Sequence, residues 1–250
     1  MKLTRTFLLG LKEVPNSFYY ALRIEFLFHS NKLEGSTFNR DALNQLADKN
    51  IVSGIHTLDD VIETRNFLDV FDFIIETLGE PLSLQLIRKY HQLSKNGTSD
   101  DKKGFSGSFK KIPNMLSDLD EIKLAEPPEV EPLLLGLIDL YNTKKATSIS
   151  LNELSYFHSN FEKIHPFQDG NGRIGRFLLL KQCLENNTDL IAIDEKYNKE
   201  YTDALYESQL NGNYDKLIGI LKKCQKYIKS KEDIIISSNE ALKNLNTYKD

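Results

Sequence analysis

The stretch HPFQDGNGRIGR, residues 165–176, combines a titratable base, a carboxylate, closely spaced glycines and two arginines. The apolar run FLLL at residues 177–180 follows directly and predicts a buried helix. Gly170 and Gly172 lack a Cβ atom, so backbone amides there can approach a ligand closely. A helix N-terminus also presents unpaired N–H groups and the positive end of a dipole to anions. The stretch therefore predicts a phosphate-binding site at the start of a helix.

Five side chains of this stretch suit the chemistry of a bound nucleotide. Asn171 can donate its amide to a phosphate oxygen. Arg173 and Arg176 are three positions apart, so they should share a helix face and offer planar donor forks to phosphates. Asp169 is a hard oxygen ligand suited to Mg²⁺, and His165 can accept a proton near neutral pH. Each residue alone has a structural explanation, such as a helix cap or a solvated face, but together they favour a catalytic site.

These residues resemble the signature of the Fic family, His-Pro-Phe-x-Asp/Glu-Gly-Asn-Gly-Arg-x-x-Arg, at every specified position. The segments 157–164 and 198–205 are similar to the family's helix before the active loop and to a later core helix. The resemblance covers about residues 80–225. It implies an all-α fold, a Fic helical bundle with a short β-hairpin flap over the active site. It also implies an enzyme that transfers AMP from ATP to a protein hydroxyl.

The resemblance assigns a role to each signature residue. His165 would be the catalytic base, and Asp169 would hold Mg²⁺ or Mn²⁺ on the phosphates of the co-substrate ATP. The residues expected to bind the ATP phosphates are Gly170, Asn171, Gly172, Arg173 and Arg176. The candidates for an adenosine pocket are Tyr197, Asn198 and Tyr201. On the helix before the loop, His158 is expected to be a buried orienting residue.

A second motif, Ser30-Asn31-Lys32-Leu33-Glu34-Gly35, resembles the inhibitory pattern Ser/Thr-x-x-x-Glu-Gly/Asn of Fic proteins. In a helix, Ser30 and Glu34 are neighbours on one face, and Gly35 suits a helix end. In the family this glutamate pairs with the second signature arginine, here Arg176, and keeps the ATP γ-phosphate from its productive place. The N-terminal position resembles the class II type, which inhibits itself within one chain. The alternative is a helix end with a solvated glutamate.

A third motif lies at residues 104–113 and looks like the family's flap, which binds a target segment by strand addition. Its candidate target-binding residues are Gly107, Ser108, Phe109 and Lys110. The chain departs from the family here, because many members carry an arginine where this chain has Lys110. The alternative is an ordinary surface hairpin.

The composition narrows the function classes. The net charge of −4 and a pI near 5.8 give no support to a nucleic-acid-binding role. Two cysteines are too few for a disulfide framework. The apolar run at residues 133–138 is far shorter than the ~20 residues that span a bilayer. The first ten residues lack an apolar run long enough for a signal peptide. We therefore expect a cytoplasmic protein without a membrane or nucleic-acid partner.

Apolar spacing predicts a mostly helical chain. The expected helices lie around 18–28 and at 58–78, 83–93, 133–141, 150–163, 174–185, 196–210 and 214–229, with a loop at 94–111 and a break at 126–132. The expected regions are an N-terminal helical region carrying the inhibitory motif (1–79), the Fic core (80–225) and a C-terminal helical or flexible tail (226–250).

The sequence therefore predicts an autoinhibited protein adenylyltransferase that modifies a Ser, Thr or Tyr hydroxyl of an unknown target protein, with self-modification as one option. The resemblance also leads us to expect a homodimer. Two alternatives use the same site: an enzyme that removes AMP, with Glu34 positioning water, and a nucleotide-sensing binding module. The signature grips phosphates and not bases, so another nucleotide or CDP-choline stays open as the donor.

Overall fold

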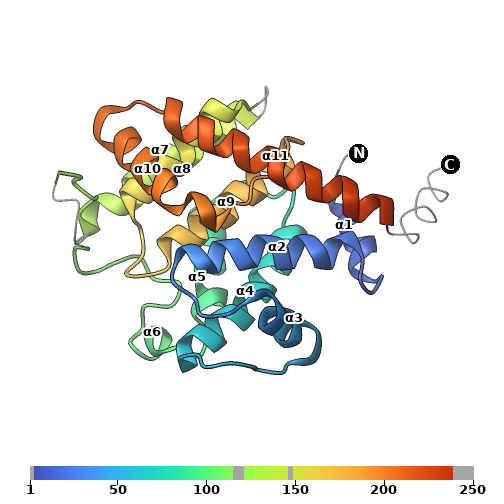
Figure 1. Ribbon diagram of the computed structural model, residues 1–250. Helices are drawn as coiled ribbons and strands as arrows, with labels where there is room; N and C mark the ends of the chain where they lie inside the picture. Colours follow the sequence, from blue (N-terminus) through green and yellow to red (C-terminus); the bar gives the residue numbers. More distant parts are fainter. Residues whose placement is uncertain (1–2, 115–120, 146–148, 239–250) are drawn as a thin grey trace.

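The computed structural model describes residues 3–114, 121–145 and 149–238, which form a helical bundle (Figure 1). Across these ranges no residue lies in a β-strand. The helices are α1 (Arg5–Lys12), α2 (Phe18–Leu33), α3 (Arg40–Lys49), α4 (Leu58–Glu76), α5 (Leu84–Lys95), α6 (Ser99–Lys102), α7 (Pro127–Lys145), α8 (Leu151–Ile164), α9 (Asn171–Glu185), the 3₁₀ helix η1 (Glu195–Tyr197), α10 (Asn198–Asn211) and α11 (Asp215–Ser238).

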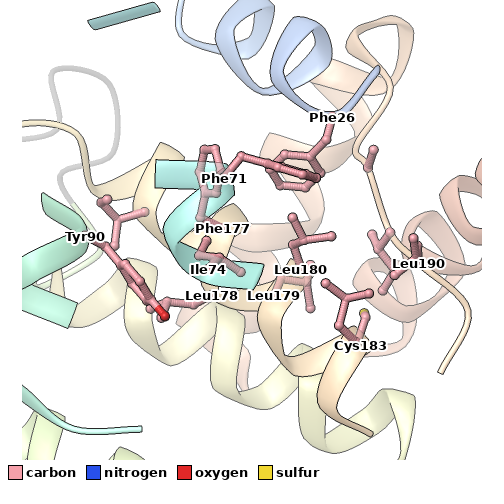
Figure 2. Close-up of a cluster of buried hydrophobic side chains, with 14 of the residues drawn as sticks. Phe26, Phe71, Ile74, Tyr90, Phe177, Leu178, Leu179, Leu180, Cys183 and Leu190 are labelled. Carbon is pink, nitrogen blue, oxygen red and sulfur yellow. The ribbon is translucent and has the colours of Figure 1, made fainter. Parts of the chain in front are cut away.

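Helix α9 lies at the centre of the bundle, in contact with α2, α4, α5 and α8 (Figure 1). Its run at residues 177–180 is almost completely buried. Phe177 meets the ring of Phe26 from α2 edge-on, with centroids 4.9 Å apart (Figure 2), and stacks on Phe67 from α4 at 5.2 Å. A helix that is apolar on all sides is stable only when other elements surround it. The signature stretch therefore enters the middle of the core.

Local signals fix both ends of α8, the helix that leads to the signature loop. Ser150 forms a capping box with Glu153, in which each side chain bonds the other residue's backbone N–H. At the other end, His165 adopts a left-handed conformation with φ of 49°. Such a residue turns the chain out of the helix. The cap and the turn together place His165 at the mouth of the loop.

Most of the expected helices are confirmed, with ends shifted by a few residues, except that α11 runs nine residues beyond its expected end at 229. They correspond to α2, α4, α5, α8, α9, η1 with α10, and α11. The break predicted at 126–132 is wrong, because α7 begins at Pro127. Proline in a first helical turn loses no hydrogen bond, and only Pro132 lies inside the helix. Helices α1, α3 and α6 were not expected.

The β-hairpin flap predicted at 104–113 is also wrong, because this segment consists of turns and irregular chain. Its backbone bonds to other parts of the molecule and not to a partner strand. The N–H of Gly107 donates to Nδ1 of His91 at 3.0 Å, and its carbonyl accepts from Nε of Arg88 at 2.7 Å. The N–H of Lys110 donates to the signature loop at 2.9 Å. The segment is therefore pinned to α5 and to the loop.

The expected division at residues 79 and 225 stays a prediction, and the last part of the tail, 239–250, lies outside the described residues. One hydrophobic core runs from Phe7 to Ile228 and so draws on all three expected regions. No helix in the described ranges combines the length and apolar composition needed to cross a membrane.

Candidate active site

Asn171 closes the signature loop between α8 and α9. Its Oδ1 accepts from the N–H of Phe167 at 2.7 Å, and its Nδ2 donates to the carbonyl of the same residue at 2.8 Å. Phe167 is fully buried and anchors the loop in the core. Gly170, directly before Asn171, has a φ of 81°, which suits a residue without a Cβ. The side chain that was expected to bind phosphate thus holds the loop in shape in this structure.

His91, from α5, packs against the same loop. Its ring stacks on Phe167 with centroids 3.8 Å apart and planes 2° apart. Nδ1 accepts from Gly107, so the proton lies on Nε2, which donates to the carbonyl of Asp169 at 3.0 Å. Burial lowers the pKa of His91 to about 4, which keeps the ring neutral at pH 7. The stacking and the two hydrogen bonds give this histidine a structural role.

His165 is held as a neutral base. Its Nδ1 donates to the carbonyl of Glu162 at 3.2 Å, which leaves Nε2 as the unprotonated nitrogen. Burial, with a smaller contribution from the nearby ammonium of Lys110, lowers its pKa to about 4. A neutral imidazole with a free nitrogen can accept the proton of a hydroxyl. This geometry suits the general-base role predicted for His165.

Lys110 contacts the loop on both sides of His165. Its N–H donates to the carbonyl of Pro166 at 2.9 Å, and its Nζ donates to the carbonyl of Ile164 at 3.2 Å. The residue is 3 % exposed. Phe109, next to it, packs against Phe167 with centroids 5.6 Å apart. Phe109 and Lys110, two of the four candidate flap residues, therefore support the signature loop.

Lys95, from α5, bonds the carboxylate of Asp169, the predicted metal ligand. Lys95 also donates to Glu63 of α4 at 2.5 Å and to Asp100 of α6 at 3.1 Å. Burial alone would lower the pKa of Lys95, but Glu63 and Asp169 raise it. The side chain of Asp169 is still 58 % exposed, and a carboxylate open to solvent suits Mg²⁺ when phosphates supply further oxygens. Asp169 therefore fits the predicted metal role.

The two signature arginines engage different helices, although a common direction was expected. Arg173 bonds Glu63 of α4 and lies over the ring of Phe67 at 4.9 Å. Arg176 turns toward α2, where its Nε donates to Oγ of Ser30 at 3.0 Å. The two guanidinium groups therefore pair with carboxylates from different helices, Glu63 and Glu34. Both still act on Glu34, whose pKa they lower together.

Glu34 completes the contact between α2 and Arg176. Nη2 of Arg176 donates to Oε1 of Glu34 at 2.6 Å and to the carbonyl of Ser30 at 3.0 Å. Burial raises the pKa of Glu34, but Arg176 and then Arg173 lower it below its usual value. Gly35 follows with a φ of 79°, as suits a helix end. The structure brings Ser30 and Glu34 of the second motif to Arg176 on α9, and Gly35 ends the helix that carries them.

A cavity of about 260 Å³ joins these parts. Its lining includes Glu34, Glu162, His165, Gly172, Arg176, Asn198 and Tyr201. Tyr201 is buried, and its hydroxyl bonds Nε2 of His158 at 2.7 Å; the predicted burial of His158 is confirmed, and its orienting role stays a prediction. Tyr197 is not part of this lining; it lies beside Lys196, whose Nζ is 4.8 Å from the ring centroid. The cavity therefore holds two of the three adenosine candidates.

Sequence reasoning missed Lys95, Glu63, Glu162 and the role of His91. Glu162 lies against α9, where a Cβ on Gly175 would come within 2.2 Å of its Oε1. That buried oxygen has no partner among the described residues. A carboxyl three residues before a catalytic histidine was the one local signal for this residue. Lys95 and Glu63 carry no such signal, because only the fold brings them to the loop.

Comparison with known proteins places these features in a family context. Residues 81–183 match the model of the Fic/DOC family. Over 83 residues, 33 % of this chain, the sequence is 37 % identical to a probable protein adenylyltransferase of Aquifex aeolicus (strain VF5). That match spans 25 % of the relative's length.

Solved structures share the fold. A Fic domain containing signaling protein from Bacteroides thetaiotaomicron has a TM-score of 0.73 at 23 % identity, over 82 % of this chain and 83 % of that one. Residues 134–508 of Fic-1 from C. elegans give 0.76 at 16 % identity, over 94 % of this chain and 70 % of that one.

Proposed function

Because this chain contains a Fic domain at residues 81–183, we propose that it is a protein adenylyltransferase that uses ATP to place AMP on a Ser, Thr or Tyr hydroxyl of a protein. The observation that carries the proposal is His165. Its neutral ring, with Nε2 unprotonated, lines the same cavity as Gly172 and Arg176 at the start of α9. A base beside a phosphate-binding helix start is the minimum that nucleotidyl transfer to a hydroxyl needs.

In the proposed reaction, Nε2 of His165 takes the proton of the target hydroxyl as its oxygen attacks the α-phosphorus in line. A phosphorus–oxygen bond to the target forms, the bond to the β-phosphate breaks, and pyrophosphate leaves. The backbone N–H groups at Gly172 and the start of α9 stabilise the charge on the phosphate oxygens. Asp169 would hold Mg²⁺, which would supply positive charge to offset that of the phosphates. Arg173 and Arg176 would act at the β- and γ-phosphates.

We propose further that the chain inhibits itself, in the manner of the class II type. Arg176 is 3 % exposed and donates to Ser30 and Glu34. A γ-phosphate would compete with the Glu34 carboxylate for the same guanidinium donors. The carboxylate also places a negative charge where ATP brings more. ATP would therefore settle in an unproductive position until Glu34 moves away.

Mass spectrometry of Glu34→Gly protein tests this function. The protein is incubated with ATP and Mg²⁺, alone and in cell lysate, and peptides are searched for the added mass of AMP. We expect modified hydroxyls on a target protein or on the chain itself. If the variant binds ATP and leaves every protein unmodified, the adenylyltransferase proposal is refuted. Replacing ATP by other nucleotides or by CDP-choline in the same assay identifies the donor.

A second candidate function is removal of AMP from a modified protein. The position of Glu34 favours this second function. Its side chain is 34 % exposed and lines the same cavity as His165. A carboxylate in that place can position a water for attack. Incubating an AMP-modified target with the parent protein and Mg²⁺ distinguishes the two, because only this activity releases AMP. A nucleotide-sensing module would neither transfer nor release AMP.

Measurement of the protein's size in solution tests the expected homodimer.

A further inference from the structure

Lys95 is a buried cation placed between carboxylates at the edge of the active site. It is 1 % exposed, and its Nζ donates to Glu63 and Asp100 as well as to Asp169. Oxygen atoms of these three carboxylates all lie within 4.8 Å of one another. Carboxylate oxygens this close together could serve as ligands of a divalent metal ion. In this chain the ammonium of Lys95 occupies the position between them.

The surroundings hold Lys95 in that position. Its Cε lies where a Cβ on Gly170 would approach it to 3.2 Å, so the side chain packs directly under the loop. Arg173 binds the second oxygen of Glu63 and lies 3.7 Å from Asp169. Three carboxylates thus face two buried cations, Lys95 and Arg173, for a formal charge of −1, and the exposed Lys103 lies 3.6 Å from Asp100. A divalent ion that arrives alone meets little uncompensated charge and an oxygen of Asp169 that is already bonded.

We propose that Lys95 is a resident cation that competes with the divalent metal for Asp169. Before the nucleotide arrives, Lys95 holds the carboxylate of Asp169 in place. The metal gains the site only together with the phosphates of ATP, which supply the missing negative charge and oxygen ligands. Lys95 is thus a positioning residue that couples metal binding to nucleotide binding. This inference rests on the proposed role of Asp169 as the metal ligand.

The test is the affinity of the nucleotide-free protein for Mn²⁺. Paramagnetic resonance or calorimetry measures this affinity. Lys95→Met removes the ammonium and deprives three carboxylates, Glu63, Asp100 and Asp169, of that counter-charge. We expect Mn²⁺ affinity to rise at least about tenfold, as the loss of a unit charge at contact distance implies. Lys103→Met is the matched control. That lysine reaches Asp100 at 3.6 Å but is 60 % exposed, so its removal should leave Mn²⁺ affinity unchanged.

A second variant and a second measurement guard against misfolding. Lys95→Gln keeps a hydrogen-bond donor, on a side chain one atom shorter, without the charge and should show the same gain. In the parent protein, the nitrogen resonance of the Lys95 ammonium should shift when Mg²⁺ and ATP are added together and stay unchanged with Mg²⁺ alone. Unchanged Mn²⁺ affinity in the folded variants overturns the proposal. So does a parent resonance that Mg²⁺ and ATP together leave unmoved.

These outcomes are distinguishable from failure of the proposed function. Asp169→Ala reports on the metal role by itself: if it binds Mn²⁺ with ATP as tightly as the parent, Asp169 is not the ligand and the role of Lys95 falls with it. If Lys95→Met gains Mn²⁺ affinity but no AMP transfer is ever found, the competition stands and the adenylyltransferase proposal fails.

Discussion

Oε1 of Glu34 accepts a hydrogen bond of 2.6 Å from Nη2 of Arg176. The pair joins the end of α2 to the first turns of α9, and Ser30 adds two further bonds to the same guanidinium. A Cβ on Gly172 would come within 2.3 Å of the Glu34 oxygen. The carboxylate therefore lies directly on the helix start that is proposed to bind phosphates, so its removal should change both charge and space there.

Glu34→Gly should raise the rate of AMP transfer at least about tenfold, equivalent to ~1.4 kcal/mol in the barrier. The change frees Arg176 for the γ-phosphate and lets ATP place its α-phosphorus in line with the hydroxyl. Transfer of labelled AMP from ATP measures the effect. Glu80→Gly, which removes an exposed glutamate from a bend after α4, is the matched control.

Arg176→Ala should not reproduce this gain, because it releases Glu34 but also removes a phosphate contact. The inhibitory assignment is wrong if Glu34→Gly and the parent bind ATP and transfer AMP at the same rate. Glu34 would then be a helix-end residue whose pairing with Arg176 only stabilises the fold.

His165→Ala should lower transfer by roughly 10²–10⁴-fold, the usual loss for a general base, and leave ATP binding intact. The assay is best made in the Glu34→Gly background, where the rate is expected to be high. His56→Ala is the control, since that ring stacks on Phe38 at 3.7 Å, in the smaller hydrophobic cluster around α3. Transfer that persists at the parental rate in His165→Ala would mean that another group takes the proton.

Lys110→Met should raise the pKa of His165, because a positive charge that disfavours the imidazolium is lost. The acid limb of the pH–rate profile should move to higher pH by the same amount, and the maximal rate should fall as the loop loses its bond at Ile164. Ring titration by NMR measures the pKa. Lys111→Met removes the exposed neighbouring lysine and should change neither quantity.

Lys110→Arg should restore most of the rate, because a guanidinium can donate to the same carbonyl. If Lys110→Met leaves both the titration of His165 and the rate profile unchanged, Lys110 contributes only to packing.

Glu162 should make the protein less stable as pH rises. Its pKa is raised to about 8, chiefly by burial. The positive charge of Arg176 lowers this pKa, and the negative charge of Glu34 raises it; both effects are included in that value. The folded state then holds a proton that the unfolded chain releases above its ordinary pKa of 4.5. The free energy of unfolding should therefore fall between about pH 4.5 and 8, by at most ~1.4 kcal/mol per pH unit, and level off above.

Urea unfolding at several pH values measures this slope. Glu162→Gln should remove that component and be more stable than the parent at pH 8. Glu131→Gln, an exposed position on α7, should keep the parental slope. Equal slopes in the parent and Glu162→Gln would show that Glu162 is ionised in the folded protein.

Local patterns predicted much of this structure. The helices around the signature loop and the burial of α9 follow from apolar spacing and end signals that lie within a few residues of each other. The position of Ser30 and Glu34 against Arg176 was predicted through family resemblance, since nothing in residues 30–35 alone names a partner 142 residues away.

Long-range charge pairing was not predictable in the same way. The directions of Arg173 and Arg176 are set by Glu63 and Glu34, which lie on different helices. Lys95 reads as one more polar residue at the end of an amphipathic helix, and its burial depends on acids from α4, α6 and the loop. The flap segment has the glycines of a hairpin, but its backbone forms hydrogen bonds with α5 and with the signature loop instead of with a second strand.

The order of residues along the chain has a consequence during synthesis. Glu34 precedes Arg176 by 142 residues, so it leaves the ribosome well before the helix that it covers. Translation proceeds at about 5–20 residues per second, and N-terminal segments begin to fold first. When α9 emerges, the carboxylate that pairs with its second arginine is already available. A newly made copy would therefore fold directly into the form in which Glu34 pairs with Arg176. Cellular nucleotides would at no time meet a proposed phosphate-binding turn that lacks this carboxylate.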